Sequence, residues 1–221
     1  MLAEILPPPV AADEAFGDPP DAALFPEEQA VVARAVDQRR REFAAVRACA
    51  RAGLARLGAP PAPILPGERG APQWPAGIVG SMTHCAGYRA SAVARAADLR
   101  TLGLDAEPDA RLPDGVLDAV ASADERAGLA ALAAAAPGPS WDRLLFCAKE
   151  TVYKAWFPLT GRWLGFAQAV VTINPADGTF AARLLVDGPV LDGRPLTGFT
   201  GRWLARDGLL LAAIAVPRRP G

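Results

Sequence analysis

The chain repeats one order of predicted elements: a helix, a connector and paired strands occur in residues 27–95 and again in residues 115–216. Pro26 and the acids after it start the first helical pattern, which allows one break, and Gly58 stops it. Turn signals divide three predicted strand pairs: Ala86 and Gly87, Asp177 and Gly178, Asp207 and Gly208. The two copies agree in element order but not residue by residue. The order predicts an α+β fold of two similar halves that face each other, with a cleft at their junction near Asp105.

A second helix of the later copy is predicted to begin at Trp141, where apolar residues recur at helical spacing. Pro158 and Gly161 are predicted to end it. Glu150 and Lys154 lie one turn apart, roughly opposite the apolar stripe, and aromatic side chains flank them. A Glu–Lys pair at this spacing is the commonest arrangement on a helix surface and contributes only ~0.2–0.5 kcal/mol. The aromatic flanks indicate an alternative, in which this helix face lines a cleft. The other motifs must decide between an exposed surface pair and a cleft.

Two acids alternate with apolar residues in residues 102–107, which show the period-two pattern of a strand. Asp105 and Glu107 are therefore expected to point to the same side, and Pro108 keeps Glu107 extended. Two carboxylates with few other hard ligands suit Mg²⁺, which keeps several waters and shares its coordination sphere with substrate phosphates. A solvated strand end is the competing interpretation of so short a motif.

Basic groups precede these acids in the chain. Several arginines of the first helix fall close together on a helical wheel: Arg39, Arg40, Arg47 and Arg51. They form either a solvated basic face or a site for a phosphate-rich ligand. His84, the one histidine of the chain, follows Thr83 at the end of a predicted strand. A structural role and a functional role for this histidine are both open at this point.

Composition limits the classes of partner. The net charge of −1 gives no overall basic field for nucleic acid. The three cysteines form no CxxC pair and no Cys/His cluster, so neither a disulfide scaffold nor a zinc site is predicted. No apolar run approaches the ~20 residues of a membrane span, and the N-terminus does not resemble a secretory signal. We therefore expect a soluble, cytoplasmic protein without a nucleic-acid or membrane partner, and an extended arm in residues 1–23.

Three stretches together resemble the signatures of the 4′-phosphopantetheinyl transferases: GSMTHCAGYRASAVA, LGLDAE and FCAKETVYKAW, in this order. The match is to the surfactin- and enterobactin-synthetase type, in its actinobacterial branch, and it is weakest in residues 1–25 and after residue 170. Members of this family are monomers of about this length, built as two pseudo-symmetric α+β halves with the active site at their junction. The resemblance therefore implies an N-terminal half in residues 1–103 and a C-terminal half in residues 104–221.

The resemblance also implies roles at matching positions. Three acids would hold Mg²⁺, or Mn²⁺ in its place, against the coenzyme A pyrophosphate: Asp105, Glu107 and Glu150. Seven side chains would contact coenzyme A: Arg39, Arg47, Arg69, Thr83, His84, Lys149 and Lys154. Arg39 and Arg47 resemble arginines that bind the 3′-phosphate and adenine end. Lys149 and Lys154 resemble paired lysines near the reacting phosphate. Arg69 stands near the position where many members have a lysine.

The implied reaction moves the 4′-phosphopantetheine arm of coenzyme A onto a serine of an apo acyl or peptidyl carrier protein and releases 3′,5′-ADP. Glu150 is the candidate base, with Lys154 orienting it. A carboxylate bound fully to a metal ion is a poor base, so the base and metal-ligand roles of Glu150 stay alternatives. Carriers of fatty-acid, polyketide and nonribosomal peptide synthesis all fit the resemblance.

Two other classes of function use the same residues. In the first, the chain is a non-catalytic module that binds carrier domains or nucleotides, and its acids and bases are ordinary surface pairs. In the second, it is a metal-dependent nucleotide hydrolase that uses the same carboxylates. Modification of an apo carrier protein distinguishes the transferase from both.

Overall fold

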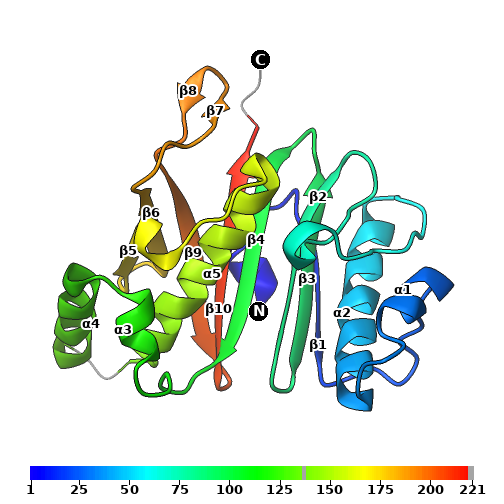
Figure 1. The fold of residues 1–221 in the computed structure, drawn as a ribbon, viewed down its shortest axis with the longest axis horizontal. Coiled ribbons are helices and arrows are strands. Elements are labelled where there is room, and N and C mark those ends of the chain that lie inside the picture. The colour runs from blue at the N-terminus through cyan, green and yellow to red at the C-terminus, as the bar shows by residue number, and fades with distance from the viewer. Residues whose placement is uncertain (136–137, 219–221) are drawn as a thin grey trace.

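A computed structural model of the 221-residue chain describes residues 1–135 and 138–218, and Figure 1 shows two α+β halves side by side. The first half contains three antiparallel strands in the order β1-β3-β2. Helix α2 packs against β3 and β1 of this sheet. The elements of this half are η1 (Leu2–Glu4), β1 (Ala11–Phe16), α1 (Pro26–Val31), α2 (Asp37–Arg56), η2 (Glu68–Gly70), β2 (Ile78–Cys85) and β3 (Tyr88–Arg95), where η marks a 3₁₀ helix.

The second half is built on a five-stranded antiparallel sheet in the order β4-β10-β9-β6-β5. Helix α5 crosses one face of this sheet and packs against β4 and β10 (Figure 1). Its elements are β4 (Leu99–Pro108), α3 (Val116–Val120), α4 (Ala123–Ala135), α5 (Trp141–Thr160), η3 (Phe166–Gln168), β5 (Ala169–Asn174), β6 (Thr179–Leu184), β7 (Val190–Leu191), β8 (Arg194–Pro195), β9 (Gly198–Arg206) and β10 (Leu209–Pro217). Among the helices described, none combines the length and the apolar character needed to cross a membrane.

The two halves meet where β2 lies beside β4 (Figure 1). The Ser81 hydroxyl on β2 accepts a hydrogen bond from the Leu104 N–H at 3.0 Å, and the Thr83 hydroxyl accepts one from the Ala106 N–H at 3.1 Å. Hydroxyl groups, rather than a continuous backbone ladder, therefore link the two sheets. A shared core of residues from η1, β3, β4 and β10 closes the junction: Leu2, Tyr88, Leu102, Leu104, Leu209 and Leu211. The predicted α+β fold of two halves is confirmed.

The turn signals located the strand pairs correctly. β2 and β3, β5 and β6, and β9 and β10 are antiparallel pairs joined at the three predicted turns. Gly87, Gly178 and Gly208 all have positive φ angles there, which glycine adopts without steric cost. The predicted break in the first helical pattern is also present, between α1 and α2.

The prediction of an extended arm in residues 1–23 is wrong. Residues 11–16 form β1, which pairs with β3, and the side chains of Leu2 and Ile5 are buried in the shared core. The stretch AADEAF has no alternation of apolar and polar residues, so its sequence gave no strand signal. Burial of the two apolar side chains ahead of it holds the segment against the first sheet.

The alanine-rich stretch differs from its predicted extent, whereas α5 ends directly before the predicted Gly161. The alanine-rich stretch predicted as one helix in residues 113–136 forms two helices up to residue 135, α3 and α4, because Ser122 and Glu125 make a reciprocal capping box at the start of α4. Residue 136 lies outside the described residues. The end of α5 lies beyond Pro158, at Thr160, and Gly161 caps it in the left-handed conformation. A proline this close to the C-terminus removes one helical hydrogen bond, and the Gly161 N–H still bonds the Phe157 carbonyl at 2.8 Å.

The predicted division of the halves after residue 103 falls within the strand β4. β4 begins at Leu99 and pairs along its length with β10, so its first residues belong to the second sheet. β3 ends at Arg95 in the first sheet. We therefore propose a boundary in residues 96–98, the turn between these two strands.

Gly103 is the position on β4 where α5 approaches most closely. A Cβ atom there would lie 2.3 Å from the Thr151 carbonyl oxygen of α5. Gly103→Ala should therefore push the helix away from the strand and destabilise the fold by about 1–3 kcal/mol, which lowers Tm by roughly 2–10 °C. Gly128→Ala in α4 is the matched control, because a Cβ there meets nothing within 4 Å and alanine favours a helix. An unchanged Tm for Gly103→Ala would contradict this close approach.

Candidate functional site at the junction of the two halves

A buried carboxylate lies at the centre of the junction. Asp105, on β4, is only 5% exposed. Its Oδ1 atom accepts hydrogen bonds from the Thr83 hydroxyl at 3.0 Å and from the Lys154 ammonium at 2.7 Å. Its Oδ2 atom is buried and has no hydrogen-bond partner among the described residues. Side chains from β2, β4 and α5 therefore converge on one carboxylate that keeps an unused oxygen.

The local sequence explains how α5 comes to lie above Asp105. The glycine at position 103 lets the helix backbone approach the strand, and the Thr101 hydroxyl donates to the Ala155 carbonyl at 2.8 Å. Lys154 then spans the short distance to the strand, where it also donates to the Leu104 carbonyl at 3.1 Å. The position of Lys154 is therefore set by backbone contacts between α5 and β4, not by its own charge alone.

Glu107 and Glu150 add negative charge around Asp105. Burial and the Asp105 charge raise the pKa of Glu107, although Arg143 donates to its carboxylate at 3.0 Å and opposes this shift. Burial and the Asp105 charge likewise raise the pKa of Glu150. The carboxylates therefore lie within electrostatic range of one another. They do not form a ready-made metal cage, since no group of three or more His, Cys, Asp or Glu side chains in residues 1–135 and 138–218 is arranged to hold an ion.

The chemistry of these groups nevertheless fits a divalent cation. Asp105 offers a buried carboxylate oxygen without a hydrogen-bond donor, which is costly unless a positive charge approaches it. Carboxylate oxygens are the ligands that Mg²⁺ prefers, and Mg²⁺ needs only one or two of them when it shares phosphate oxygens of a substrate. A cation here would offset the mutual repulsion that raises the pKa values of Glu107 and Glu150.

Basic and polar groups line a cavity of about 390 Å³ on the α2 side of the junction. The Nε2 atom of His84 lies 2.8 Å from Nη1 of Arg39. A guanidinium only donates hydrogen bonds, so this imidazole nitrogen accepts and the ring is neutral. Burial and the Arg39 charge lower the pKa of His84. Glu42 lies 3.8 Å from the other ring nitrogen and 3.9 Å from Arg39, and so orients both side chains.

A second cavity, of about 400 Å³, adjoins the first. Glu150 and Lys154 line it together with Arg69, and Gly70, Pro72 and Met82 line both cavities. The two therefore share a wall. Seven of the predicted site residues divide between them, with Arg39, Arg47, Thr83 and His84 in the first cavity and Arg69, Glu150 and Lys154 in the second.

Arg47 lines the first cavity, and its guanidinium is engaged by groups of the protein itself. It is 5% exposed, its Nε donates to the Ile64 carbonyl at 2.8 Å, and its guanidinium lies 3.1 Å from the centre of the Phe43 ring. Nη1 makes a longer hydrogen bond of 3.4 Å to the Phe43 carbonyl, and Nε lies 3.7 Å from the buried Glu28 carboxylate. Burial lowers the pKa of Arg47 to about 10. Its guanidinium holds the connector against α2, and the predicted contact of Arg47 with the 3′-phosphate stays a prediction.

Lys149 is also engaged inside the protein. Its ammonium donates to the Glu125 carboxylate at 2.9 Å and to the carbonyls of Phe166 and Ala169 at 2.9 and 3.0 Å. These three bonds use all three N–H groups of a lysine side chain. The side chain is 3% exposed. The predicted contact of Lys149 with the reacting phosphate stays a prediction, and these contacts favour a structural role instead.

The sequence analysis missed two residues that hold the site groups. Arg143, in the first turn of α5, binds Glu107. Glu42 lies three residues after Arg39 on α2 and close to His84. The spacing of Glu42 from Arg39 was a readable signal for an ion pair. The contact between Arg143 and Glu107 spans 36 residues and had no local signal.

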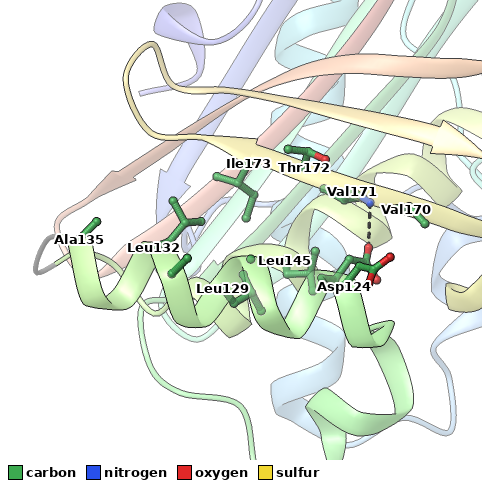
Figure 2. Close-up of a pocket in the computed structure, with 12 residues that line it drawn as sticks. Asp124, Leu129, Leu132, Ala135, Leu145, Val170, Val171, Thr172 and Ile173 are labelled. Carbon is green, nitrogen blue, oxygen red and sulfur yellow. Dashed lines mark hydrogen bonds between the residues drawn. The ribbon is translucent and has the colours of Figure 1, made fainter.

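A cavity of about 490 Å³ elsewhere in the second half contains none of the predicted site residues. It lies between α4 and the edge strand β5, and Figure 2 shows apolar side chains from both elements along its walls. Among these are Leu129, Leu132 and Ile173. The groups capable of acid–base and phosphate chemistry therefore concentrate at the junction.

Comparisons with known proteins agree with the family that the three motifs indicate. A family model described as the 4′-phosphopantetheinyl transferase N-terminal domain matches residues 27–94, and one for the 4′-phosphopantetheinyl transferase superfamily matches residues 101–194. The chain is 59% identical to 4′-phosphopantetheinyl transferase Svp of Streptomyces mobaraensis, over 100% of this chain and 91% of that protein. It is 50% identical to PptT of Mycobacterium tuberculosis, over 98% of both chains.

A third relative extends this agreement. The chain is 51% identical to 4′-phosphopantetheinyl transferase Npt of Nocardia iowensis, over 97% of this chain and 99% of that protein. The matches cover both halves, so the resemblance seen in the motifs is confirmed for the whole fold. The chain therefore belongs to the 4′-phosphopantetheinyl transferase family, and its activity is the transfer of phosphopantetheine onto carrier proteins.

Proposed function

We propose that the junction binds coenzyme A with a divalent cation and directs its phosphopantetheine arm to the serine of a carrier protein. The observation that carries this proposal is the buried Asp105 carboxylate, which is held by Thr83 and Lys154 and keeps one oxygen without a partner. Family members generally use Mg²⁺ and coenzyme A, and the acids around Asp105 fit that chemistry. Asp105, Glu107 and Glu150 would hold Mg²⁺, which Mn²⁺ can replace.

The phosphates of coenzyme A belong on the basic side of the junction. Arg39 has a half-exposed side chain, and it lies with Thr83 and the neutral His84 along the first cavity. Arg39 supports a 3′-phosphate contact because a guanidinium matches phosphate geometry. His84 would contact the pyrophosphate, Thr83 would lie beside it while its hydroxyl stays bonded to Asp105, and Arg69 would reach it from the second cavity. Lys154 would lie beside the reacting phosphate while it stays bonded to Asp105.

The chemical step is a phosphoryl-type transfer. The serine oxygen forms a bond to the phosphorus that carries the pantetheine arm, and the bond from that phosphorus to the oxygen of 3′,5′-ADP breaks. The serine proton passes to Glu150 in the alternative in which this carboxylate acts as the base and not as a metal ligand. The bound cation supplies Lewis-acid stabilisation of the charge on the leaving group. In the metal-free protein, burial and the Asp105 charge raise the pKa of Glu150. Lys154 contributes by holding the Asp105 carboxylate in a fixed position through their hydrogen bond.

The proposal also covers the oligomeric state, the partners and the location of the protein. We propose that one chain is sufficient for activity, because both halves of the site come from a single polypeptide. The expected partners are apo acyl or peptidyl carrier domains. A cytoplasmic location stays a prediction, as does the absence of nucleic-acid and membrane partners.

Asp105→Asn tests the centre of the site. The substitution keeps the size of the side chain but removes the charge, so transfer should fall by about 100-fold or more while Tm stays within a few degrees. Intact mass of an apo carrier protein, incubated with coenzyme A and limiting Mg²⁺, measures the transfer as a gain of one phosphopantetheine arm. Exposed Asp114→Asn is the control. Near-normal transfer by Asp105→Asn at limiting Mg²⁺ contradicts the assignment, and nucleotide breakdown without carrier modification would indicate a hydrolase.

Arg39→Ala tests the phosphate contact. Losing one charge-assisted bond should raise KM for coenzyme A by about 10-fold or more but leave KM for 3′-dephospho-coenzyme A nearly unchanged. Arg47→Ala is the matched comparison, because its buried guanidinium should affect Tm rather than the ratio of the two KM values. An equal loss of affinity for both ligands in Arg39→Ala refutes the 3′-phosphate contact.

Glu150→Gln tests the electrostatics of the acids. Because the pKa of Glu150 in the folded protein is raised above 4.5, its ionised form destabilises the fold, and this cost grows as pH rises from 4.5 through the folded pKa. In metal-free protein at neutral pH, Glu150→Gln should therefore raise Tm while abolishing most of the transfer activity. Thermal unfolding with EDTA from pH 4.5 to 8 measures this. A lower Tm for the variant across that range argues against the crowding of carboxylates.

A further inference from the structure

Glu125 and Lys149 form a buried ion pair behind the active-site face of α5. Their side chains are 1% and 3% exposed, and the carboxylate and ammonium are 2.9 Å apart. Besides this bond, Lys149 donates to the carbonyls of Phe166 and Ala169. One lysine on α5 thus fixes both ends of η3 and the start of β5.

Glu125 extends the same network to α4. Its Oε1 atom accepts from the Val171 N–H of β5 at 2.8 Å, the dashed line in Figure 2, and its Oε2 atom accepts from the Ser122 N–H at 2.7 Å. Burial alone would raise the pKa of Glu125, but the N–H groups of Val171 and Ser122 and the Lys149 ammonium outweigh it and lower the pKa. The glutamate is therefore ionised, and it fixes α4, α5 and β5 to one another.

The next residue after Lys149 is the catalytic candidate Glu150. The carboxylate of Glu150 has no hydrogen bond to another of the described residues, so its position depends on where α5 places it. Lys149, Glu150 and Tyr153 also line one small cavity of about 120 Å³ with residues 163–166 and Ala169. The contacts of Lys149 therefore fix both the rotation of α5 about its axis and the opposite wall of that cavity.

Stability alone does not account for such a pair. Removing two charges from water costs several kcal/mol per ion, and apolar residues of similar volume often stabilise a core as well or better. Directed bonds, however, fix orientation more narrowly than apolar packing does. Besides bonding to each other, the two side chains of the ion pair bond to four backbone groups in fixed directions, and Lys149 lies next to the residue that needs a defined position.

We propose that Glu125 and Lys149 are positioning residues for the transfer reaction, which hold Glu150 in its working orientation. Neither contacts substrate. The inference rests on the proposed role of Glu150. It means that two residues of the second half, which line neither of the two site cavities, hold the catalytic candidate in position.

The test compares single and double variants of the pair. Glu125→Gln or Lys149→Met alone should lower both Tm and kcat, because each leaves a buried partner unsatisfied. The double variant Glu125→Gln with Lys149→Met removes both charges and should recover most of the lost Tm. Its kcat should nevertheless stay about 10- to 100-fold below wild type, with KM for coenzyme A within about twofold, since small misplacement of a reacting group costs this much. Lys149→Arg should restore part of kcat.

The controls separate this inference from the proposed function. The exposed pair Glu4 and Arg206, changed to Gln and Met, should leave kcat and KM unchanged. In a Glu150→Gln background, adding the double variant should produce little further loss of kcat, which a merely structural role would not predict. Wild-type kcat in the double variant, with Glu150→Gln inactive, overturns the positioning role alone. Full activity of Glu150→Gln overturns that role and the proposed role of Glu150 together.

Discussion

The hydrogen bonds to the Asp105 carboxylate are the contacts on which the junction depends. This side chain of the second half accepts from Thr83 of the first half and from Lys154 on α5. Burial makes an ionised carboxylate expensive unless donors or a cation compensate for the lost water. The Thr83 hydroxyl also accepts from the Ala106 N–H, which holds β2 beside β4. The group that organises the chemistry therefore also joins the two halves.

The two halves bring opposite charges to this contact. The acids come from β4 and α5 of the second half, whereas Arg39 and His84 come from α2 and β2 of the first. A substrate with a pyrophosphate and a separate phosphate bridges such an arrangement, because its charges meet arginine on one side and carboxylates with a cation on the other. Of the two adjoining cavities, the first contains Arg39 and His84, and the second contains Glu150 beside residues of both halves. Two halves, each with one part of the binding chemistry, thus explain why the site lies at their boundary.

The sequence predicted the parts of the site that follow from local periodicity. Alternation in β4 predicted that Asp105 and Glu107 share a side, and helical spacing placed Glu150 and Lys154 together. The buried contacts of Arg47 and Lys149 could not be predicted from local periodicity. A helical wheel does not show that the connector at Ile64 covers Arg47, or that Glu125, 24 residues earlier, meets Lys149. Distant segments bury both side chains and so determine their contacts. Pairing with the distant strand β3 likewise makes residues 11–16 a strand.

The central claim is that acids from β4 and α5 hold one divalent cation at the junction. The most direct measurement is an anomalous difference map from crystals of the protein grown with coenzyme A and Mn²⁺. The account predicts a single strong peak within ligand distance of Asp105 and Glu150, in contact with the pyrophosphate. A peak bound only by groups outside the junction, with the pyrophosphate held by basic residues alone, would contradict it.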